Sequence, residues 1–350
     1  MAHPYTIREI ARQAGLSEAT VDRVLNDRGG VRESTAREVR QAVRDLDRQR
    51  TQVRLGGRTF MIDIVMRAPE RFSSSVREAL ESQLPSLRPA VLRSRFHFRE
   101  TGPVSELIGT LDRIAARGSQ GVILKAPDVP GTTAAVGRLV EAGIPVVTLV
   151  TDLPGSARLA YVGIDNRAAG ATAAYLVGQW LGERPAHVLT TVSRGFFRGE
   201  EEREMGFRAA MRAAHPARTL VEVTDSDGLD ATQRDLVLAA LERDRDIRAV
   251  YSIGGGNAAT VGAFEEMGRE CAVFVAHDLD HDNTRLLGER RISAVLHHDL
   301  RQDLRRACQI VMRAHGALPA EAGPALPSAI QVVTPYNLPP EVTAPAPAGG

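Results

Sequence analysis

The chain has 350 residues, of which 43% are hydrophobic and 25% are charged, a composition typical of a folded globular protein with two or three domains. No stretch approaches the roughly 20 apolar residues of a membrane span and no charged-then-apolar leader precedes the first helix, so we expect a cytoplasmic protein without membrane contacts. Residues 1–58 carry 12 Arg and 8 acidic residues, which is a net charge of +4. Because the net charge of the whole chain is +1, the remaining residues carry −3. Such a basic head is typical of a module that faces DNA.

Three short helices are predicted in the first fifty residues. The spacing of Thr6 and Glu9 is that of a capping box, in which the Thr6 hydroxyl accepts from the Glu9 amide while Glu9 reaches back. Gly15 ends this helix because it adopts the left-handed conformation without strain, and Ser17 caps the next helix. The apolar stripes are Ile7, Ile10, Ala11 and Ala14; Val21, Val24 and Leu25; and Val39, Ala42, Val43 and Leu46.

The first two helices flank a tight turn at residues 14–16 and together predict a helix-turn-helix, whose second helix enters the major groove by its N-terminal end. Arg23 can bind guanine with two hydrogen bonds or hold a phosphate. The alternative is a three-helix unit for protein contacts, with its polar residues merely solvated. The residues expected at the DNA are Ser17, Glu18, Ala19, Thr20 and Arg23.

After Gly56 and Gly57 the pattern changes to short apolar runs that alternate with amphipathic helical stretches. Alternation of this kind predicts parallel sheets covered on both faces, and the strands are too many for one compact open sheet, so two lobes are expected. The expected strands are Phe60–Met66, Gly121–Lys125, Pro145–Leu149, Ala186–Val192, Ala249–Ile253, Ala272–Ala276 and Ala294–Leu296. The expected helices include Ser75–Leu84, Val104–Arg117, Thr132–Glu141, Arg167–Leu181, Glu202–Ala214, Ala231–Glu242 and Ala258–Met267.

The head resembles the lactose-repressor (LacI/GalR) family. The resemblance rests on residues 5–11 (YTIREIA), 14–17 (AGLS) and 20–26 (TVDRVLN), and Val31 and Thr35 continue it. It implies a transcriptional repressor, not an enzyme, that binds a near-palindromic operator as a homodimer. It also implies that Glu18 and Ala19 select operator bases. The full set of DNA-binding residues expected is Thr6, Ser17, Glu18, Ala19, Thr20, Arg23, Asn26, Arg32, Arg54 and Leu55.

The head departs from this family at two places. Asp22 stands where the family commonly has Ser, and its charge is unfavourable near phosphate unless it pairs with an Arg. Residues 47–57 replace the family's Asn-Tyr-x-Pro-Asn segment and its minor-groove Leu. Arg54 and Leu55 remain the candidates for that role, although two glycines weaken a hinge helix there by about 1 kcal/mol each.

The body resembles the periplasmic sugar-binding-protein fold that this family uses as its sensor. The fold class expected is therefore an all-α helix-turn-helix head followed by an α/β body with two Rossmann-like lobes. The expected limits are 1–50 for the head, 51–58 for a linker and 59–341 for the body. Within the body, the N-lobe takes 59–162 and 297–332, the C-lobe takes 163–296 and 333–341, and 342–350 form a disordered tail.

In that fold a small ligand lies in the cleft between the lobes, where the carboxyl ends of the strands meet. An aromatic face, carboxylates, an Arg and an amide are suited to a sugar ring and its vicinal hydroxyls. Alternatives stay open: Phe72 as core, Asp165 and Asn257 as helix caps, and Glu201, where some sugar-binding relatives have Arg, as evidence against a pentose. The effector-binding candidates are Phe72, Asp152, Asp165, Arg203, Asn257, Asp278 and His298.

Two other interpretations are weaker. Gly254, Gly256 and Ala259 follow a predicted strand, with Asp278 after the next one, as in a dinucleotide fingerprint, but no second half supports it. The histidines and aspartates of 277–282 and 297–299 suggest a metal, without helical spacing or cysteine support, and the two cysteines of the chain are too few for a disulfide framework or a zinc site. We expect no cofactor, no metal and, because the tail lacks heptads, no tetramerising coiled coil.

Overall fold

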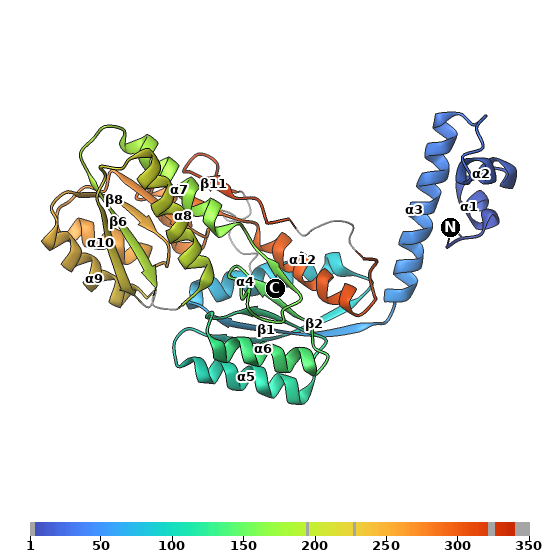
Figure 1. Cartoon of the computed structure of the whole chain (residues 1–350), viewed down its shortest axis with the longest axis horizontal. Coiled ribbons are helices and arrows are strands. Elements are labelled where there is room, and N and C mark those ends of the chain that lie inside the picture. Colours follow the sequence, from blue (N-terminus) through green and yellow to red (C-terminus); the bar gives the residue numbers. More distant parts are fainter. Residues whose placement is uncertain (1–3, 194–195, 227–228, 321–325, 340–350) are drawn as a thin grey trace, which may run out of the picture.

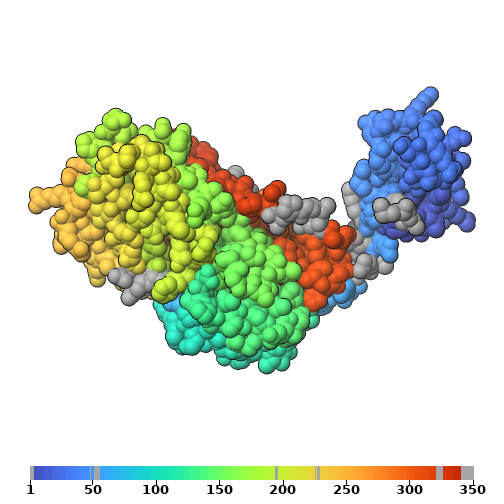
Figure 2. All heavy atoms as spheres, viewed as in Figure 1, coloured from blue at the N-terminus to red at the C-terminus, as the bar shows by residue number. Residues whose placement is uncertain are grey.

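The computed structural model describes residues 4–193, 196–226, 229–320 and 326–339, with the backbone alone at 48, 51–55 and 225. The expected tail at 342–350 lies outside these residues. Figure 1 shows a small helical head that stands apart from a two-lobed body, and Figure 2 shows the same separation in the molecular surface. Among the described residues, no helix has both the length and the apolar character required to cross a membrane. The expected fold class is confirmed.

The head consists of α1 (Ile7–Ala14), α2 (Glu18–Leu25) and α3 (Glu33–Leu55). The capping box at Thr6 and Glu9 is confirmed, and Gly15 ends α1 with a φ of 66°. The three helices bury one small core, made by Ile10, Ala11, Val21, Val39 and Ala42. The backbone of α3 continues without a break through residues 51–55, so the first part of the expected 51–58 linker is helical and only its last residues are not.

The N-lobe is a parallel five-stranded sheet with the order β2-β1-β3-β4-β5. Helices cover both faces, as the alternation of strands and helices predicts. The strands are β1 (Thr59–Arg67), β2 (Val91–Arg99), β3 (Gly121–Lys125), β4 (Val146–Leu149) and β5 (Ala160–Val162); the helices are α4 (Glu70–Gln83), η1 (Leu84–Leu87), α5 (Val104–Arg117) and α6 (Pro130–Glu141). The edge strand β2 is absent from the expected elements because its arginines interrupt the apolar run that marks a buried strand.

The C-lobe sheet has six strands in the order β11-β10-β9-β8-β6-β7, and only β11 runs antiparallel to its neighbour. Its strands are β6 (His187–Ser193), β7 (Leu220–Ser226), β8 (Ile247–Ser252), β9 (Val273–His277), β10 (Ala294–His297) and β11 (Gln331–Val333). Its helices are α7 (Asn166–Leu181), α8 (Arg198–Ala214), α9 (Asp230–Arg243), α10 (Asn257–Glu266) and α11 (His281–Gly288). Figure 1 shows these helices on the two faces of the sheet.

The chain passes between the lobes more than once. After β10 it returns to the N-lobe as α12 (Leu300–Ala314), which buries Leu304, Ala307 and Val311 in the N-lobe core. It re-enters the C-lobe sheet at Gln331, two residues before the expected 333. A bridge between Ile164 and Ser328 pairs two of the crossing segments. The carboxyl ends of β1, β3, β8 and β9 therefore face a common space between the lobes.

Candidate functional site

The N-terminal end of α2 presents the side chains expected at DNA. Ser17, Glu18, Ala19 and Arg23 are exposed. Ser17 caps the helix by accepting from the Thr20 amide at 3.2 Å, and the two hydroxyl oxygens lie 2.8 Å apart. A capped helix end with exposed short side chains leaves room for a duplex to approach closely.

Asp22 has the arginine partner that its position requires. Its carboxylate pairs with Arg28 at 2.9 Å and accepts from the Asn26 amide at 2.7 Å. The negative charge at this point of α2 is therefore offset within the head. Asn26 and Arg32 are exposed, and Thr6 is engaged in its capping box. The backbone of α3 includes Arg54 and Leu55, whose side chains lie outside the described residues.

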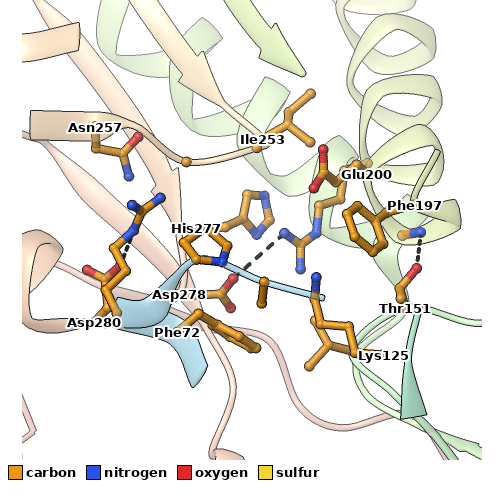
Figure 3. Close-up of a pocket in the computed structure, with 18 of the residues that line it drawn as sticks. Phe72, Lys125, Thr151, Phe197, Glu200, Ile253, Asn257, His277, Asp278 and Asp280 are labelled. Atoms are coloured by element: carbon orange, nitrogen blue, oxygen red, sulfur yellow. Dashed lines mark hydrogen bonds and ion pairs between the residues drawn. The ribbon is translucent and has the colours of Figure 1, made fainter. Parts of the chain in front are cut away.

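A pocket lies between the two lobes, at the carboxyl ends of the strands. Figure 3 shows its lining: Phe72 forms one wall, Lys125 and Phe197 lie at one end, and Asn257 and Asp280 lie at the other. The N-lobe contributes Ala68, Pro69, Arg71, Phe72, Lys125, Val150 and Thr151. The C-lobe contributes Phe197, Gly199, Glu200, Arg203, Ile253, Gly254, Gly255, Asn257, His277, Asp278, Asp280 and Asn283.

Polar contacts across the pocket join the two lobes. Arg71 of α4 pairs with Asp280, which caps α11, at 3.2 Å. The Gly199 amide in the first turn of α8 donates to the Thr151 hydroxyl at 2.9 Å, and Figure 3 marks both contacts. The lobes are therefore closed on each other around the pocket.

The C-lobe wall is held by a network of buried side chains. Arg203 of α8 donates to the Asn166 side chain at 2.8 Å, and its guanidinium lies 4.0 Å from the Asp278 carboxylate. Asn283 donates to the carbonyls of His277 and Asp278, and accepts from Asn257 at 2.7 Å. Asp278 has a positive φ of 63°, a strained conformation for a residue other than glycine. The hydrogen bonds from Asn283 hold the backbone in this turn and keep the Asp278 carboxylate at the pocket.

Four buried polar atoms at and behind this wall have no hydrogen-bond partner among the described residues. They are Asn257 Oδ1, His277 Nδ1, Asp278 Oδ1 and His298 Nε2. A buried polar atom without a partner costs about 1–3 kcal/mol. Since three of these atoms belong to residues that line one pocket, a polar ligand that bonds to them would recover that free energy.

Burial shifts the pKa values of three pocket side chains. The pKa of His277 lies well below its usual value, first because it is buried and then because Arg203 is near, so the ring is neutral. Burial lowers the pKa of Lys125 to about 8 and raises that of Asp280 to about 6. Shifts of this kind gather at ligand and catalytic sites.

Acid is expected to destabilise the C-lobe through His277. The unfolded chain binds a proton below pH 6.5 more readily than the folded protein does, so this contribution falls as the pH falls, by at most about 2 kcal/mol at pH 5.0. His297, whose pKa is lowered by burial to about 4, contributes with the same sign. Asp280 has the opposite sign between pH 6 and 3.8, because there the folded form binds the proton more tightly. Urea unfolding at pH 7.5 and 5.0, followed by the fluorescence of Trp180, the one tryptophan of the chain, measures the sum.

Replacing His277→Gln should make this acid-induced loss smaller than in the wild type. The control is His281→Gln, because the side chain of His281 is 90% exposed and should leave the loss unchanged. Equal losses in the wild type and in the His277 variant would contradict the assignment.

Four of the seven predicted effector residues line the pocket: Phe72, Arg203, Asn257 and Asp278. Phe72 also packs in the N-lobe core, so both interpretations of it hold. Asn257 is the first residue of α10 and does not cap it; the cap is Gly256.

The other three predicted residues do not line the pocket. Asp152 is occupied by Arg158 at 2.6 Å and by Thr148 at 2.8 Å. Asp165 caps α7 by accepting from the Ala168 amide and is exposed, which is its alternative interpretation. His298 lies behind the wall, bonded to Asp303 and 3.6 Å from the Asp278 carboxylate.

The seven predicted effector residues do not include several of the lining residues. Those with polar or aromatic side chains are Arg71, Lys125, Thr151, Phe197, Glu200, His277, Asp280 and Asn283. Two of them carried a usable signal. Lys125 ends a strand that was predicted and is the single lysine of the chain, and Asp280 has the spacing of a helix cap with Asn283.

The backbone and its close neighbours explain why glycine stands at positions 254 and 256 of the dinucleotide-like segment. A Cβ at Gly254 would lie 2.7 Å from the Ser193 amide nitrogen, and Gly256 has a φ of 71° with Gln233 packed against it. The two histidine clusters do not converge on a metal-binding geometry. Among the described residues, the group close enough to share an ion is His187, Asp244 and Asp246, at the opposite ends of the C-lobe strands.

Comparison with known proteins relates both parts of the chain to established families. Residues 64–315 match the periplasmic binding protein domain and residues 6–49 match the bacterial regulatory proteins of the lacI family. A sucrose operon repressor from Vibrio alginolyticus is 53% identical over 38 residues, which are 11% of this chain and 40% of that protein.

Solved structures share the fold of the body. GanP, a glucose-galactose binding protein from Geobacillus stearothermophilus, has a TM-score of 0.70 at 20% identity, over 80% of this chain and 99% of its own. A putative LacI transcriptional regulator from Bacteroides fragilis has 0.69 at 16% identity, over 80% and 98%. A solute-binding protein from Burkholderia graminis in complex with D-arabinose has 0.69 at 19% identity, over 81% and 97%.

Proposed function

The chain belongs to the periplasmic binding protein domain family and carries a lacI-type DNA-binding head, and from this premise we propose that it is a transcriptional repressor whose affinity for DNA is set by a sugar bound between its lobes. The observation that carries the proposal is the set of unpaired polar atoms on one pocket wall: Asn257 Oδ1, His277 Nδ1 and Asp278 Oδ1. Hydroxyl groups are the natural partners of such atoms, and Phe72 offers a flat apolar face beside them.

The names of the relatives favour the same class of ligand. They include a sucrose operon repressor, a glucose-galactose binding protein and a protein in complex with D-arabinose. We therefore assign ligand contacts to Phe72, Arg203, Asn257 and Asp278, and operator contacts to the exposed residues of α2. A repressor acts on the chromosome, so we place the protein in the cytoplasm.

Lobe closure couples the pocket to the head. The contacts Arg71–Asp280 and Gly199–Thr151 join the lobes in the closed form, and a ligand held by both lobes favours that state. The head is joined to the N-lobe where α3 leads into β1, so a change in lobe angle moves the two heads of a dimer relative to each other. The ligand alters DNA affinity by its differential affinity for the closed and open forms. The units of this mechanism are the head (1–50), the connection (51–58) and the body (59–341).

The dimer is proposed to form along β2, the edge of the N-lobe sheet. Its outer edge has no strand partner among the described residues, and an uncovered nine-residue edge is a template for pairing with another chain. Phe96 and Phe98 of this strand are partly exposed, with Arg77 stacked 4.0 Å from the centre of the Phe96 ring. A two-fold dimer presents two heads, which matches a near-palindromic operator.

Thermal unfolding of the full-length protein tests the sugar assignment. We expect one sugar class in a panel of aldoses, sugar acids and sugar phosphates to raise the melting temperature, because a ligand that binds only the folded form at 100 times its Kd stabilises it by ~2.7 kcal/mol. Nucleotides and divalent metals complete the panel.

Two variants localise this response. Asp278→Asn should lose it, since this carboxylate lies at the pocket, whereas Asp165→Asn should keep it, because Asp165 caps α7 outside the pocket. A response to NAD or zinc alone would contradict the sugar proposal.

A further inference from the structure

Lys125 is the one lysine among the 350 residues of the chain, which also contains 43 arginines and nine histidines. It is the last residue of β3, so it lies at the carboxyl edge of the N-lobe sheet and at the pocket. The single side-chain ammonium of the chain, a compact point of charge, therefore lies where the ligand is expected.

The groups in closest contact with the ammonium of Lys125 are neutral. Nζ donates to the Arg67 carbonyl at 3.2 Å and lies 3.9 Å from the centre of the Phe197 ring and 5.8 Å from that of Phe72. Among the described residues, no carboxylate oxygen lies within 4.0 Å of it. Burial disfavours the charged form, and Arg203 and Arg67 add to this effect while the charges of Glu200 and Asp278 oppose it, so that the pKa falls to about 8.

The other charged groups of the pocket have partners. Arg71 pairs with Asp280 at 3.2 Å, and Arg203 faces Asp278 at 4.0 Å. Glu200 accepts from the amide and the hydroxyl of Ser193 at 3.0 and 2.7 Å. Among the described lining residues, the lysine is thus the cation with no carboxylate oxygen within 4.0 Å, and Glu200 and Asp278 act on it only from a greater distance. The alternative role, a cation–π contact that only holds the lobes together, is worth about 0.5–2 kcal/mol and leaves the desolvated charge uncompensated.

We propose that Lys125 binds a carboxylate of the ligand, so that the effector is a sugar acid rather than a neutral sugar. This inference rests on the proposed function. Figure 3 places Lys125 at one end of the pocket and Asn257 at the other, so one elongated ligand meets the ammonium with its acidic end and the unpaired oxygens of Asn257 and Asp278 with its hydroxyls. One ammonium balances the single charge of a carboxylate, whereas a phosphate carries about −1.5 to −2 at pH 7.

Isothermal titration of the full-length protein with matched sugars tests the proposal. Each set contains an aldose, its uronic or aldonic acid and its terminal phosphate, in the gluco, galacto, manno, arabino and xylo series. In the set that binds, the acid is expected to bind at least tenfold more tightly than the aldose. Lys125→Met should reduce this preference at least tenfold, and Lys125→Arg should retain more of it than the Met variant.

The outcomes separate this proposal from the sugar assignment itself. If the aldose binds more tightly than its acid, or the phosphate more tightly than the acid, the carboxylate assignment is wrong and the sugar proposal stands. If no member of any set binds, both are overturned.

A measurement on the unaltered protein guards against variants that fail to fold. Acetylation with an amine-reactive ester modifies a single lysine, and mass spectrometry compares its rate with that of the N-terminal amine. The sugar acid should slow acetylation of Lys125 at least tenfold and its aldose should slow it less. Equal protection by both would overturn the proposal.

Discussion

Operator binding by the full-length protein is expected to weaken by about 10³–10⁵-fold when the salt concentration rises from 50 to 200 mM. Each arginine that contacts a phosphate releases condensed counterions, and 6–10 contacts from two heads produce a loss of this size. The head has the charge for it, with a net of +4 in residues 1–58. The ion pair with Arg28 offsets the charge of the Asp22 carboxylate, which would otherwise repel a nearby phosphate.

The operator is first selected from random duplex DNA by the full-length protein, and fluorescence anisotropy then gives the Kd at each salt concentration. Arg23→Gln separates two roles of this exposed side chain. If Arg23 holds a phosphate, the slope of log K against log salt becomes shallower by about 1; if it reads a base, about 1–3 kcal/mol of affinity is lost without a change in slope. Arg138→Gln, in α6 of the body, is the control. A slope near zero for the wild type would contradict DNA binding through the head.

Phe98→Glu is expected to convert a dimer into monomers and to lower operator affinity by about 10²–10⁴-fold. The affinity falls because the second head of a dimer binds at the high effective concentration that its link to the first head provides. A carboxylate in β2 disfavours pairing of this edge with a second copy, since its charge would be buried in the proposed interface. Analytical ultracentrifugation and anisotropy measure the two effects.

Phe98 also packs against the N-lobe core, so a second variant is needed. Arg77→Glu changes an exposed side chain that stacks on Phe96, and it should weaken the dimer without removing a core residue. The control is Tyr175→Glu, because Tyr175 is 64% exposed on α7 of the other lobe. If the dimer persists in both β2 variants, the edge of β2 is not the interface.

In the head, nearly every structural feature was predictable because the interactions that decide it are local. The capping box joins Thr6 to Glu9, the end of α1 depends on the backbone of Gly15, and Ser17 caps α2 through Thr20. Partners three or four residues apart are visible in the sequence itself. The exception is α3, which continues past residue 50 although its sequence has no apolar stripe there.

In the body, the sequence by itself determined the alternation of strands and helices, and with it the edge where ligand residues gather. Phe72, Arg203, Asn257 and Asp278 were placed there by their positions after predicted strands. The strands that were missed, β2, β5, β7 and β11, are the edges of the two sheets. An edge strand is covered on fewer sides, so its sequence does not need the continuous apolar run that marks a central strand.

Only the tertiary structure decided which of several similar residues face the ligand. Asp152, Asp165 and Asp278 all follow strands, but their side chains have different partners. Asp152 pairs with Arg158, and Asp165 caps a helix. Asp278 lines the pocket because its backbone is left-handed, a conformation that Asn283 holds. Among the described residues, Asn257 Oδ1 has no hydrogen-bond partner and Lys125 has no carboxylate oxygen within 4.0 Å, and both properties depend on neighbours from distant parts of the chain. A sequence lists its polar groups, but their satisfaction depends on long-range contacts, and for that reason the fold was predictable here while the chemistry of the pocket was not.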